Sequence, residues 1–220
     1  MKLKLILLFV LATAGISARA QSGFPFDNEI REFKRQDSIQ MPPKKGILFI
    51  GSSSIRKWTD LEQRFDGLPI IRRGVGGSTL QQLVNNFTPY ILFPYKPKKV
   101  FIYAGENDIA EGKSGVFVAQ QFTKLWRMLE DKLPNAEIYF LSVKPSPSRA
   151  KYADQVRAAN RLIKIFLLSR GNGHYVDVST PILNQVTGQP DPALFEKDML
   201  HLNKSGYDRW QAVLQPLVLK

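Results

Sequence analysis

The sequence predicts one three-layer α/β/α domain, flavodoxin-like in outline, with a five-stranded parallel sheet between two layers of helices. Short apolar runs rich in β-branched and aromatic residues alternate along the chain with amphipathic segments of helical period. Strands that alternate with helices in this way usually form a parallel sheet that is covered on both faces. With 220 residues, 44% of them hydrophobic, the chain is long enough to bury one sizeable core.

The strands are predicted from five apolar runs, which are nearly continuous, as expected where both faces of a strand are buried. In chain order they are residues 46–50, 68–73, 98–104, 136–143 and 174–178. The fifth run has the weakest strand signal.

The segments around these runs are predicted to be helices. The helical segments are residues 26–40, 78–87, 116–133, 153–170 and 202–220. Within the third of them, apolar side chains recur at the spacing of one helix face, namely Phe117, Phe122, Leu125, Leu129 and Leu133. Pro42 and Pro43 separate the first helical segment from the first strand.

Residues 1–20 are predicted to be a secretory signal peptide and not part of the folded domain. Two lysines precede an apolar stretch over residues 5–14, and the sequence Ala-Arg-Ala that follows ends at Ala20. A charged region, a short apolar region and a small-x-small cleavage site in this order are typical of such signals. We expect cleavage after Ala20, so that residues 21–220 form a single domain with no membrane span. An uncleaved N-terminal anchor is the alternative, although the apolar stretch is short for a bilayer.

Cysteine content and charge narrow the cellular context. The chain contains no cysteine, so an exported form has no disulfide framework and depends on its core for stability. A bacterial periplasmic or secreted location fits this pattern best. The net charge is +12, and short basic clusters lie at residues 44–45, 72–73 and 96–99. We interpret them as a solvated basic face; attraction to anionic glycans or lipid headgroups is the alternative, and no nucleic-acid motif accompanies the charge.

Glycine-rich polar turns follow three of the predicted strands. They are residues 51–54 ("GSSS"), 74–79 ("GVGGST") and 105–108 ("GEND"). In an open parallel sheet, sites form beyond the edge at which the strands have their carboxyl ends. The three turns are therefore expected to converge on one functional site.

Only one of the two histidines has a carboxylate that is well placed to bind its ring. Asp198 lies three residues before His201, and positions i and i+3 share a face if this segment is a helical turn. His174 and Asp177 are also three residues apart, but in a strand an odd separation places side chains on opposite faces. We therefore predict that Asp198 and His201 pair, and that His174 has a structural or surface role.

A serine, a histidine and an aspartate bound to that histidine are the parts of a nucleophilic hydrolase. A serine hydroxyl is a weak nucleophile until the imidazole removes its proton, and the carboxylate orients the imidazole. The backbone N–H groups of Ser53 and Gly77 and the side-chain amide of Asn107 are predicted to bind the oxyanion. The chain has no G-x-S-x-G elbow, phosphate-binding loop or zinc-ligand cluster, so no α/β-hydrolase fold, cofactor or metal is expected.

These motifs, in this order, resemble the blocks of the SGNH (GDSL-like) esterase and lipase superfamily. "FIGSSSIRKW" is similar to its F-x-G-D-S-x-x-x-x-W block, which implies that Ser53 is the nucleophile. "RRGVGGST" resembles N-x-G-x-x-G-D-T and "GEND" resembles G-x-N-D, which implies Gly77 and Asn107 as oxyanion donors. "DMLH" resembles D-x-x-H, which implies Asp198 and His201 as the other two members of the triad. The resemblance is most detailed for the platelet-activating-factor-acetylhydrolase-like branch.

The chain departs from this family pattern at three positions. Ser52 and Ser78 stand where the family usually has aspartate, and Arg72 stands where it usually has asparagine. The groups that the chemistry needs are retained, so hydrolysis is still expected. Of the three consecutive serines, Ser53 is the predicted nucleophile, and Ser52 and Ser54 are predicted to be structural. Capping of the helix that begins near Ser54 is a further role for this stretch.

The expected activity is the hydrolysis of short-chain acyl esters, and the resemblance implies O-acetyl groups on carbohydrates. The expected partner is therefore a small-molecule or carbohydrate acyl ester. Two alternatives are a lysophospholipase or short-chain lipase, and a glycan-binding module that has the same fold without turnover. No long apolar lid segment is present, which argues against long acyl chains, and the complete triad argues against the module. We expect the loop "SVKPSPSRAKY", residues 142–152, to bear on substrate specificity.

Overall fold

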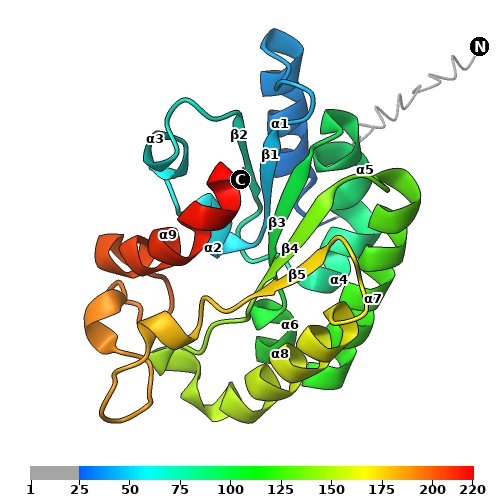
Figure 1. Cartoon of the computed structure of the whole chain (residues 1–220). Coiled ribbons are helices and arrows are strands. Elements are labelled where there is room, and N and C mark those ends of the chain that lie inside the picture. The colour runs from blue at the N-terminus through cyan, green and yellow to red at the C-terminus, as the bar shows by residue number, and fades with distance from the viewer. Residues whose placement is uncertain (1–24) are drawn as a thin grey trace, which may run out of the picture.

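A parallel sheet of five strands lies at the centre of the computed structural model, which describes residues 25–220 (Figure 1). The strands are β1 (Ile47–Gly51), β2 (Ile70–Gly74), β3 (Lys99–Tyr103), β4 (Glu137–Leu141) and β5 (Gly173–Val176). Their order across the sheet is β2-β1-β3-β4-β5, and every neighbouring pair is parallel. The predicted fold class is confirmed. The predicted signal peptide lies outside the described residues, among which no helix is long and apolar enough to cross a membrane.

Helices cover both faces of the sheet (Figure 1). One face is covered by α1 (Asp27–Ile39), α6 (Glu106–Ala110), α7 (Gly115–Lys132), α8 (Ala153–Leu167) and the segment that contains α4 (Leu80–Gln82) and α5 (Thr88–Ile91). The other face is covered by α2 (Ser53–Arg56), α3 (Leu61–Arg64) and α9 (Lys204–Leu219). Short helical turns η3 (Pro147–Tyr152), η4 (Thr180–Ile182) and η5 (Pro192–Leu194) lie in the connections.

Two separate cores result because successive side chains of a strand point to opposite faces of the sheet. Leu48 and Ile50 of β1 belong to the core shared with α1, α7 and α8, whereas Ile47 and Phe49 belong to the core shared with α9. All four side chains are fully buried. The near-continuous apolar runs in the sequence are therefore explained by burial on both faces.

An aromatic ladder crosses the sheet on the face that α9 covers. Phe49, Phe101, Tyr139 and His174 are register partners on β1, β3, β4 and β5. The successive ring centroids are 4.6, 4.4 and 4.6 Å apart, at stacking angles. Such aromatic pairs contribute about 0.5–1.5 kcal/mol each beyond the area that they bury. The ladder aligns four strands and thereby sets where their carboxyl ends lie.

The segment predicted as one helix over residues 78–87 is divided in the structure, which corrects that expectation. It comprises α4 (Leu80–Gln82), a π-helical turn η1 (Leu83–Phe87) and α5 (Thr88–Ile91), which a 3-10 turn η2 (Phe93–Tyr95) follows. Pro89 lies in the first turn of α5 and has no N–H, and in a continuous α-helix its ring would meet a carbonyl one turn earlier. The wider π turn comes just before it and keeps Leu83 and Phe87 fully buried.

Candidate active site

The three glycine-rich turns meet at the carboxyl edge of the sheet through backbone hydrogen bonds. The Ser52 N–H donates to the Tyr103 carbonyl at 3.0 Å, and the Val75 N–H donates to the Gly51 carbonyl at 2.8 Å. Gly51 has φ +148°, and a Cβ at this position would lie 1.9 Å from the Tyr103 carbonyl oxygen. Only glycine therefore allows β1 to pass so close to β3 before the serine turn begins.

Ser53 is the first residue of α2, and its hydroxyl faces the imidazole of His201. The Ser53 Oγ lies 2.8 Å from the His201 Nε2, although 148 positions separate the two residues in the chain. Ser52 and Ser54 on either side are only 2% and 1% exposed, whereas Ser53 is half-buried. Among the three serines, only Ser53 has a hydroxyl that is hydrogen-bonded to the imidazole.

The two neighbouring serines have structural positions, but helix capping is not one of their roles. Ser52 occupies the N-cap position of α2 and makes no side-chain capping bond there. The Ser54 hydroxyl interacts with the Tyr103 hydroxyl, and the Ser54 carbonyl accepts a hydrogen bond from Tyr207 of α9 at 2.8 Å. The expectation that a serine hydroxyl caps this helix is therefore wrong, and α2 is held in place from α9 instead.

Asp198 binds the ring nitrogen of His201 that faces away from the serine. The Asp198 Oδ2 lies 2.6 Å from the His201 Nδ1, and the Asp198 Oδ1 accepts the backbone N–H groups of Leu200 and His201 at 2.9 Å each. Burial by itself would raise the pKa of Asp198. The hydrogen bonds from His201 and from the backbone outweigh it and hold the pKa well below its usual range.

The segment that carries this pair is a non-helical turn, contrary to the helical turn expected from the sequence. The Glu196 N–H donates to the His201 carbonyl and the Met199 N–H donates to the Glu196 carbonyl, both at 2.8 Å. Met199 has φ +53°, the left-handed region. The Asp198 carboxylate accepts hydrogen bonds from the backbone N–H groups of Leu200 and His201. Such local bonds from a side chain compete with the hydrogen bonds of a helix. Asp198 and His201 pair as predicted, but through this turn.

Three predicted hydrogen-bond donors lie in the turns that follow β1, β2 and β3. Asn107 is in the first turn of α6, and its Nδ2 donates to the Ser78 carbonyl at 2.9 Å, which leaves a second Nδ2 hydrogen. Gly77 is exposed and has φ +77°. Within the described residues, no partner is found for the backbone N–H groups of Ser53 and Gly77. Each of the three predicted oxyanion donors therefore has one N–H group that is available to bind a substrate oxygen.

The positions that depart from the family pattern have other partners in the structure. The Ser78 hydroxyl closes its own turn by donating to the Val75 carbonyl at 2.9 Å. The Arg72 guanidinium pairs with Glu62 at 3.0 Å and donates to the Arg56 carbonyl at the end of α2 at 2.9 Å. Both residues therefore stabilise the loops that carry the site.

The second histidine lies away from this site. The His174 ring stacks on Tyr139 at the end of the aromatic ladder, and its Nε2 lies 2.5 Å from a carboxylate oxygen of Glu137. Asp177 instead accepts bonds from the backbone of Ser179 and Thr180. His174 and Asp177 do not pair, in agreement with the strand argument.

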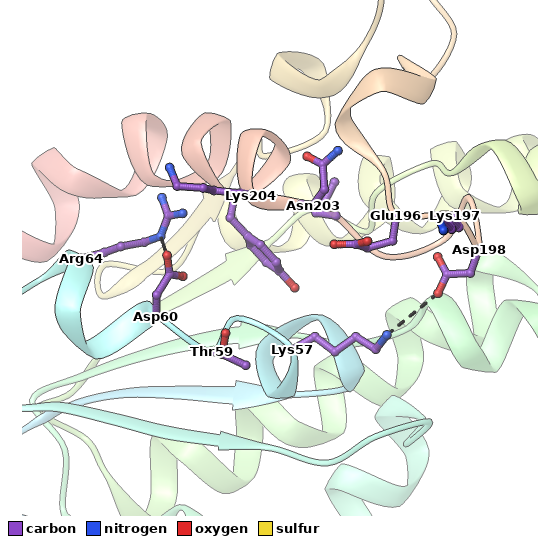
Figure 2. Close-up of a pocket in the computed structure, with 11 residues that line it drawn as sticks. Lys57, Thr59, Asp60, Arg64, Glu196, Lys197, Asp198, Asn203 and Lys204 are labelled. Carbon is purple, nitrogen blue, oxygen red and sulfur yellow. Dashed lines mark ion pairs between the residues drawn. The ribbon is translucent and has the colours of Figure 1, made fainter.

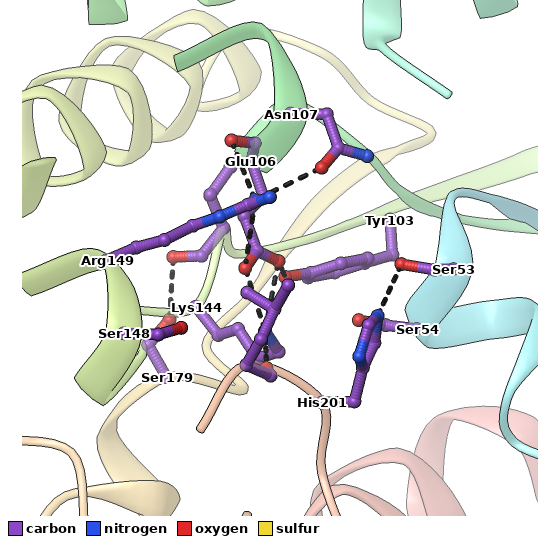
Figure 3. A network of polar contacts seen from close by, with 12 residues as sticks. Ser53, Ser54, Tyr103, Glu106, Asn107, Lys144, Ser148, Arg149, Ser179 and His201 are labelled. Carbon is purple, nitrogen blue, oxygen red and sulfur yellow. Dashed lines mark hydrogen bonds and ion pairs between the residues drawn. The ribbon is translucent and has the colours of Figure 1, made fainter. Parts of the chain in front are cut away.

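A buried polar network beside the site was not anticipated from the sequence. Glu106 and Lys144, which follow β3 and β4, form an ion pair at 3.0 Å with side chains only 7% and 0% exposed. Figure 3 shows this pair between Arg149 and Asn107 on one side and Tyr103 on the other. The one local signal for this pair in the sequence is a lysine directly after the fourth predicted strand.

An open cleft of about 700 Å³ adjoins Asp198 (Figure 2). Its lining is mostly charged, with Lys57, Arg64, Lys197 and Lys204 together with Asp60, Glu196 and Asp198. The Lys57 Nζ lies 4.0 Å from the Asp198 carboxylate, and neither Ser53 nor His201 lines the cleft. Within residues 25–220 no group of three or more histidine, cysteine, aspartate or glutamate side chains could hold a metal ion.

A serine hydroxyl, an imidazole and a carboxylate hydrogen-bonded in series at the carboxyl edge of a parallel sheet define the class of serine hydrolases. The sequence pattern of the GDSL-like Lipase/Acylhydrolase family matches residues 50–209. The chain belongs to this family, the SGNH hydrolases, and is thus a carboxylic ester hydrolase.

Known proteins resemble the chain over most of its length. Platelet-activating factor acetylhydrolase IB subunit alpha2 of Rattus norvegicus is 24% identical over 182 residues, which cover 79% of this chain and 76% of that protein. A GDSL-like lipase structure from Bacteroides thetaiotaomicron has a TM-score of 0.74 at 19% identity and covers 86% of this chain and 97% of its own. An acetyl-xylooligosaccharide esterase from Geobacillus stearmophilus has a TM-score of 0.62 at 16% identity, with coverages of 80% and 95%. The two structural likenesses show the shared fold.

Proposed function

We propose that the chain is a serine esterase that hydrolyses short-chain acyl esters, and that O-acetyl groups on carbohydrates are its natural substrates. The observation that carries the proposal is the 2.8 Å contact between the Ser53 Oγ and the His201 Nε2, continued at 2.6 Å to Asp198. A hydroxyl bound in this way can lose its proton to the imidazole as it attacks an acyl carbon.

The first half of the reaction forms an acyl-enzyme. The Ser53 Oγ attacks the ester carbonyl while the His201 Nε2 takes the hydroxyl proton, and the carbonyl electrons move onto the oxygen. As the tetrahedral intermediate collapses, His201 returns this proton to the leaving alcohol, and the acyl group stays on Ser53. Asp198 keeps the proton of the neutral ring on Nδ1, so that Nε2 is free to accept.

The second half repeats these steps with water as the nucleophile. His201 takes a proton from the water, the hydroxide attacks the acyl-enzyme, and the Ser53 oxygen leaves with the proton that His201 returns. In both halves the N–H groups of Ser53, Gly77 and Asn107 bind the oxyanion. Removing one such donor costs about 100- to 1000-fold in rate in other hydrolases.

Two comparisons support acetyl over longer acyl groups. The curated relative is named an acetylhydrolase, and a structural neighbour is named an acetyl-xylooligosaccharide esterase. The carbohydrate part of the proposal is supported by the second of these names.

The substrate proposal is tested by comparing ester hydrolysis at two chain lengths and on sugars. We expect a higher kcat/KM for p-nitrophenyl acetate than for p-nitrophenyl octanoate, and acetate release from acetylated xylooligosaccharides. A steep preference for the octanoate ester would favour the lysophospholipase or short-chain lipase interpretation and overturn the acetyl proposal.

The serine assignment is tested by three single substitutions in one turn. Ser53→Ala is expected to lower kcat by roughly 10⁴- to 10⁶-fold, since the nucleophile is lost. Ser52→Ala and Ser54→Ala serve as matched controls and should lose far less activity. Equal losses in the three variants would contradict Ser53 as the nucleophile.

Export of the chain is a further part of the proposal. It is supported by the charged, apolar and small-x-small order of residues 1–20. We expect the protein in the periplasm or medium, with a mature N-terminus at Gln21, and N-terminal sequencing after cell fractionation checks this. A cytoplasmic, uncleaved chain would contradict it.

A further inference from the structure

A short loop after β4 contacts two segments of the active site. It comprises residues 144–149 ("KPSPSR"). We call this segment the brace loop. From the sequence it was expected to bear on substrate specificity, yet its polar side chains bind the two segments that carry His201 and Asn107. Figure 3 shows the contact between Arg149 and Asn107, together with Lys144 and Ser148 of the same loop.

One end of the brace loop holds the turn that contains His201. The Lys144 Nζ donates to the Leu200 carbonyl at 2.7 Å. Ser148 donates to the Met199 carbonyl twice, from its backbone N–H at 3.0 Å and from its hydroxyl at 2.9 Å. These are the two carbonyls directly before His201, and Met199 is the residue in the left-handed region. The brace loop therefore stabilises the backbone conformation in which Asp198 and His201 pair.

The other end of the brace loop orients the side-chain amide of Asn107. The Arg149 guanidinium donates to the Asn107 Oδ1 at 3.1 Å and to the Glu106 carbonyl at 3.3 Å. With its oxygen held by a guanidinium, the Asn107 amide must present its Nδ2 on the opposite side. That nitrogen donates to the Ser78 carbonyl, and it is the atom predicted to bind the oxyanion.

The carboxylate of Glu106 joins these two ends. It lies 3.0 Å from the Lys144 Nζ at both oxygens and 3.4 Å from the Arg149 guanidinium. It also accepts a hydrogen bond from the Tyr103 hydroxyl at 2.6 Å, and Tyr103 interacts in turn with Ser54, the neighbour of the nucleophile. One buried carboxylate thus connects the serine turn, the amide of Asn107 and the turn of His201.

Packing alone does not hold the brace loop. A cavity of about 220 Å³ lies between this loop, α8 and residues 183–190, and Lys144, Ser146 and Arg149 line it. The Ser146 hydroxyl is buried and has no hydrogen-bond partner among the described residues. Because close packing is incomplete on this side, the position of the loop depends on its polar contacts.

We propose that Lys144 and Arg149 are positioning residues. They fix the Asp198–His201 pair, which moves the proton, relative to the Asn107 amide, which binds the oxyanion. This inference rests on the proposed esterase function. Each of these two parts of the site alone is a set of short contacts, but the reaction requires both to meet one carbonyl group, and a displacement of about 1 Å can cost 100-fold in rate.

The Arg149 link is tested by a double-mutant cycle with Asn107, using p-nitrophenyl acetate as the probe. Arg149→Met should lower kcat about 10- to 100-fold with little change in KM, because the oxyanion contact is made in the transition state. In an Asn107→Ala background the same substitution should cost less than about threefold, since there is no amide left to orient. Arg157→Met, at an exposed arginine of α8 that pairs with Asp154, is the matched control.

Two outcomes of this cycle would overturn the Arg149 link. One is an equal loss in both backgrounds, which would mean that Arg149 acts independently of Asn107. The other is a loss confined to KM, which would make Arg149 a substrate-binding residue. A parent enzyme with no acetyl-ester hydrolysis would instead overturn the proposed function, so the two failures are distinguishable.

The Lys144 link is tested by replacing the buried ion pair as a whole. Glu106→Gln combined with Lys144→Met removes both charges at similar volume, and such replacements often leave stability unchanged. We expect thermal unfolding close to that of the parent but a kcat at least about tenfold lower. Lys151→Met, at an exposed lysine two residues beyond the brace loop, is the control for a lost lysine.

A folded double variant with parental kcat would show that the pair has no positioning role. Should the double variant fail to fold, Ser148→Ala tests the contact of the brace loop with the His201 turn. Ser148 is exposed, and over residues 25–220 its hydroxyl binds only the Met199 carbonyl. It retains the backbone bond, so kcat should fall a few-fold with unfolding unchanged. An unaltered kcat in Ser148→Ala would then count against the link.

Discussion

The carboxylate of Asp198 orients His201 from a partly exposed position. Its side chain is 42% exposed, against 13% for His201. Water can therefore reach the carboxylate, and its position depends on the three hydrogen bonds that it accepts from Leu200 and His201. A substitution can therefore remove the hydrogen bond that orients the His201 ring and still keep the two backbone hydrogen bonds that hold the turn.

Asp198→Asn is the substitution that makes this separation. An asparagine oxygen can still accept the two backbone N–H groups, so the turn should remain. Its amide nitrogen would face the His201 Nδ1 as a donor and force the ring proton onto Nε2, which could then no longer accept from Ser53. We expect kcat to fall about 10³- to 10⁴-fold in a variant that still folds at neutral pH. A loss below tenfold would contradict the orienting role.

The lowered pKa of Asp198 also links folding stability to pH. A carboxylate whose pKa is lower in the folded than in the unfolded chain stabilises the fold above its unfolded pKa of about 3.9. This contribution is lost as the pH falls toward the folded value. The difference in stability between the parent and Asp198→Asn should therefore narrow below about pH 4, and urea unfolding at pH 7 and pH 3.5 measures it. A difference that grows on acidification would contradict this sign.

At the scale of elements, β3 caps the last turn of α9. The Lys99 Nζ donates to the Leu217 carbonyl at 2.7 Å and to the Val218 carbonyl at 3.4 Å. The last turn of α9 has no basic residue of its own. The carbonyls at a helix C-terminus lack intrahelical partners and carry partial negative charge, so a cation from the sheet stabilises them.

Lys99→Met is expected to lower the free energy of unfolding by about 1–3 kcal/mol, since it removes a charged hydrogen bond from a buried position. The kcat for p-nitrophenyl acetate should not change, because Lys99 lies at the amino end of β3, opposite to the site. Lys98→Met replaces an exposed neighbour and is the control. Equal stability of the two variants in urea would show that the contact with α9 contributes nothing.

The three central strands β1, β3 and β4 were the most predictable, because each is a mostly apolar run that is buried on both faces. The ends of the five strands differ from the predicted ends by one or two residues, since hydrogen bonds of the turns set them. For example, β5 ends at Val176, where Asp177 begins to bind the backbone of Ser179 and Thr180. The segment over residues 78–87 was predicted as one helix because periodicity does not distinguish a π turn from an α turn. Pro89 was the signal that such a division was needed.

The site residues that lie in short sequence motifs could be predicted, whereas those that act only through tertiary contacts could not. Short motifs contain Ser53, Gly77, Asn107 and the Asp198–His201 pair, and a parallel sheet brings the ends of its strands to one edge. Roles that depend on long side chains reaching across the fold leave no such local pattern. Lys144 reaches Leu200, 56 positions away in the chain, and was therefore not predicted to act on the site.

At the scale of the whole molecule, the two cores share one sheet and should unfold together. Trp58 and Trp210 lie in the core beneath α9, and Trp126 lies in the core on the other face. In the Trp126→Phe variant, tryptophan fluorescence reports only the core beneath α9. We expect its urea transition to coincide with that of far-ultraviolet circular dichroism, as in a two-state domain. Separate midpoints would mean that the two faces unfold independently.

The proposed esterase mechanism depends most on Ser53 being the nucleophile that His201 activates. The most direct measurement is reaction with a fluorophosphonate, which phosphonylates an activated serine, followed by peptide mass spectrometry. We predict a single labelled site at Ser53 in the parent, no labelling in Ser53→Ala, and strongly slowed labelling in His201→Gln. Labelling of a different residue, or undiminished labelling of Ser53→Ala, would contradict the account.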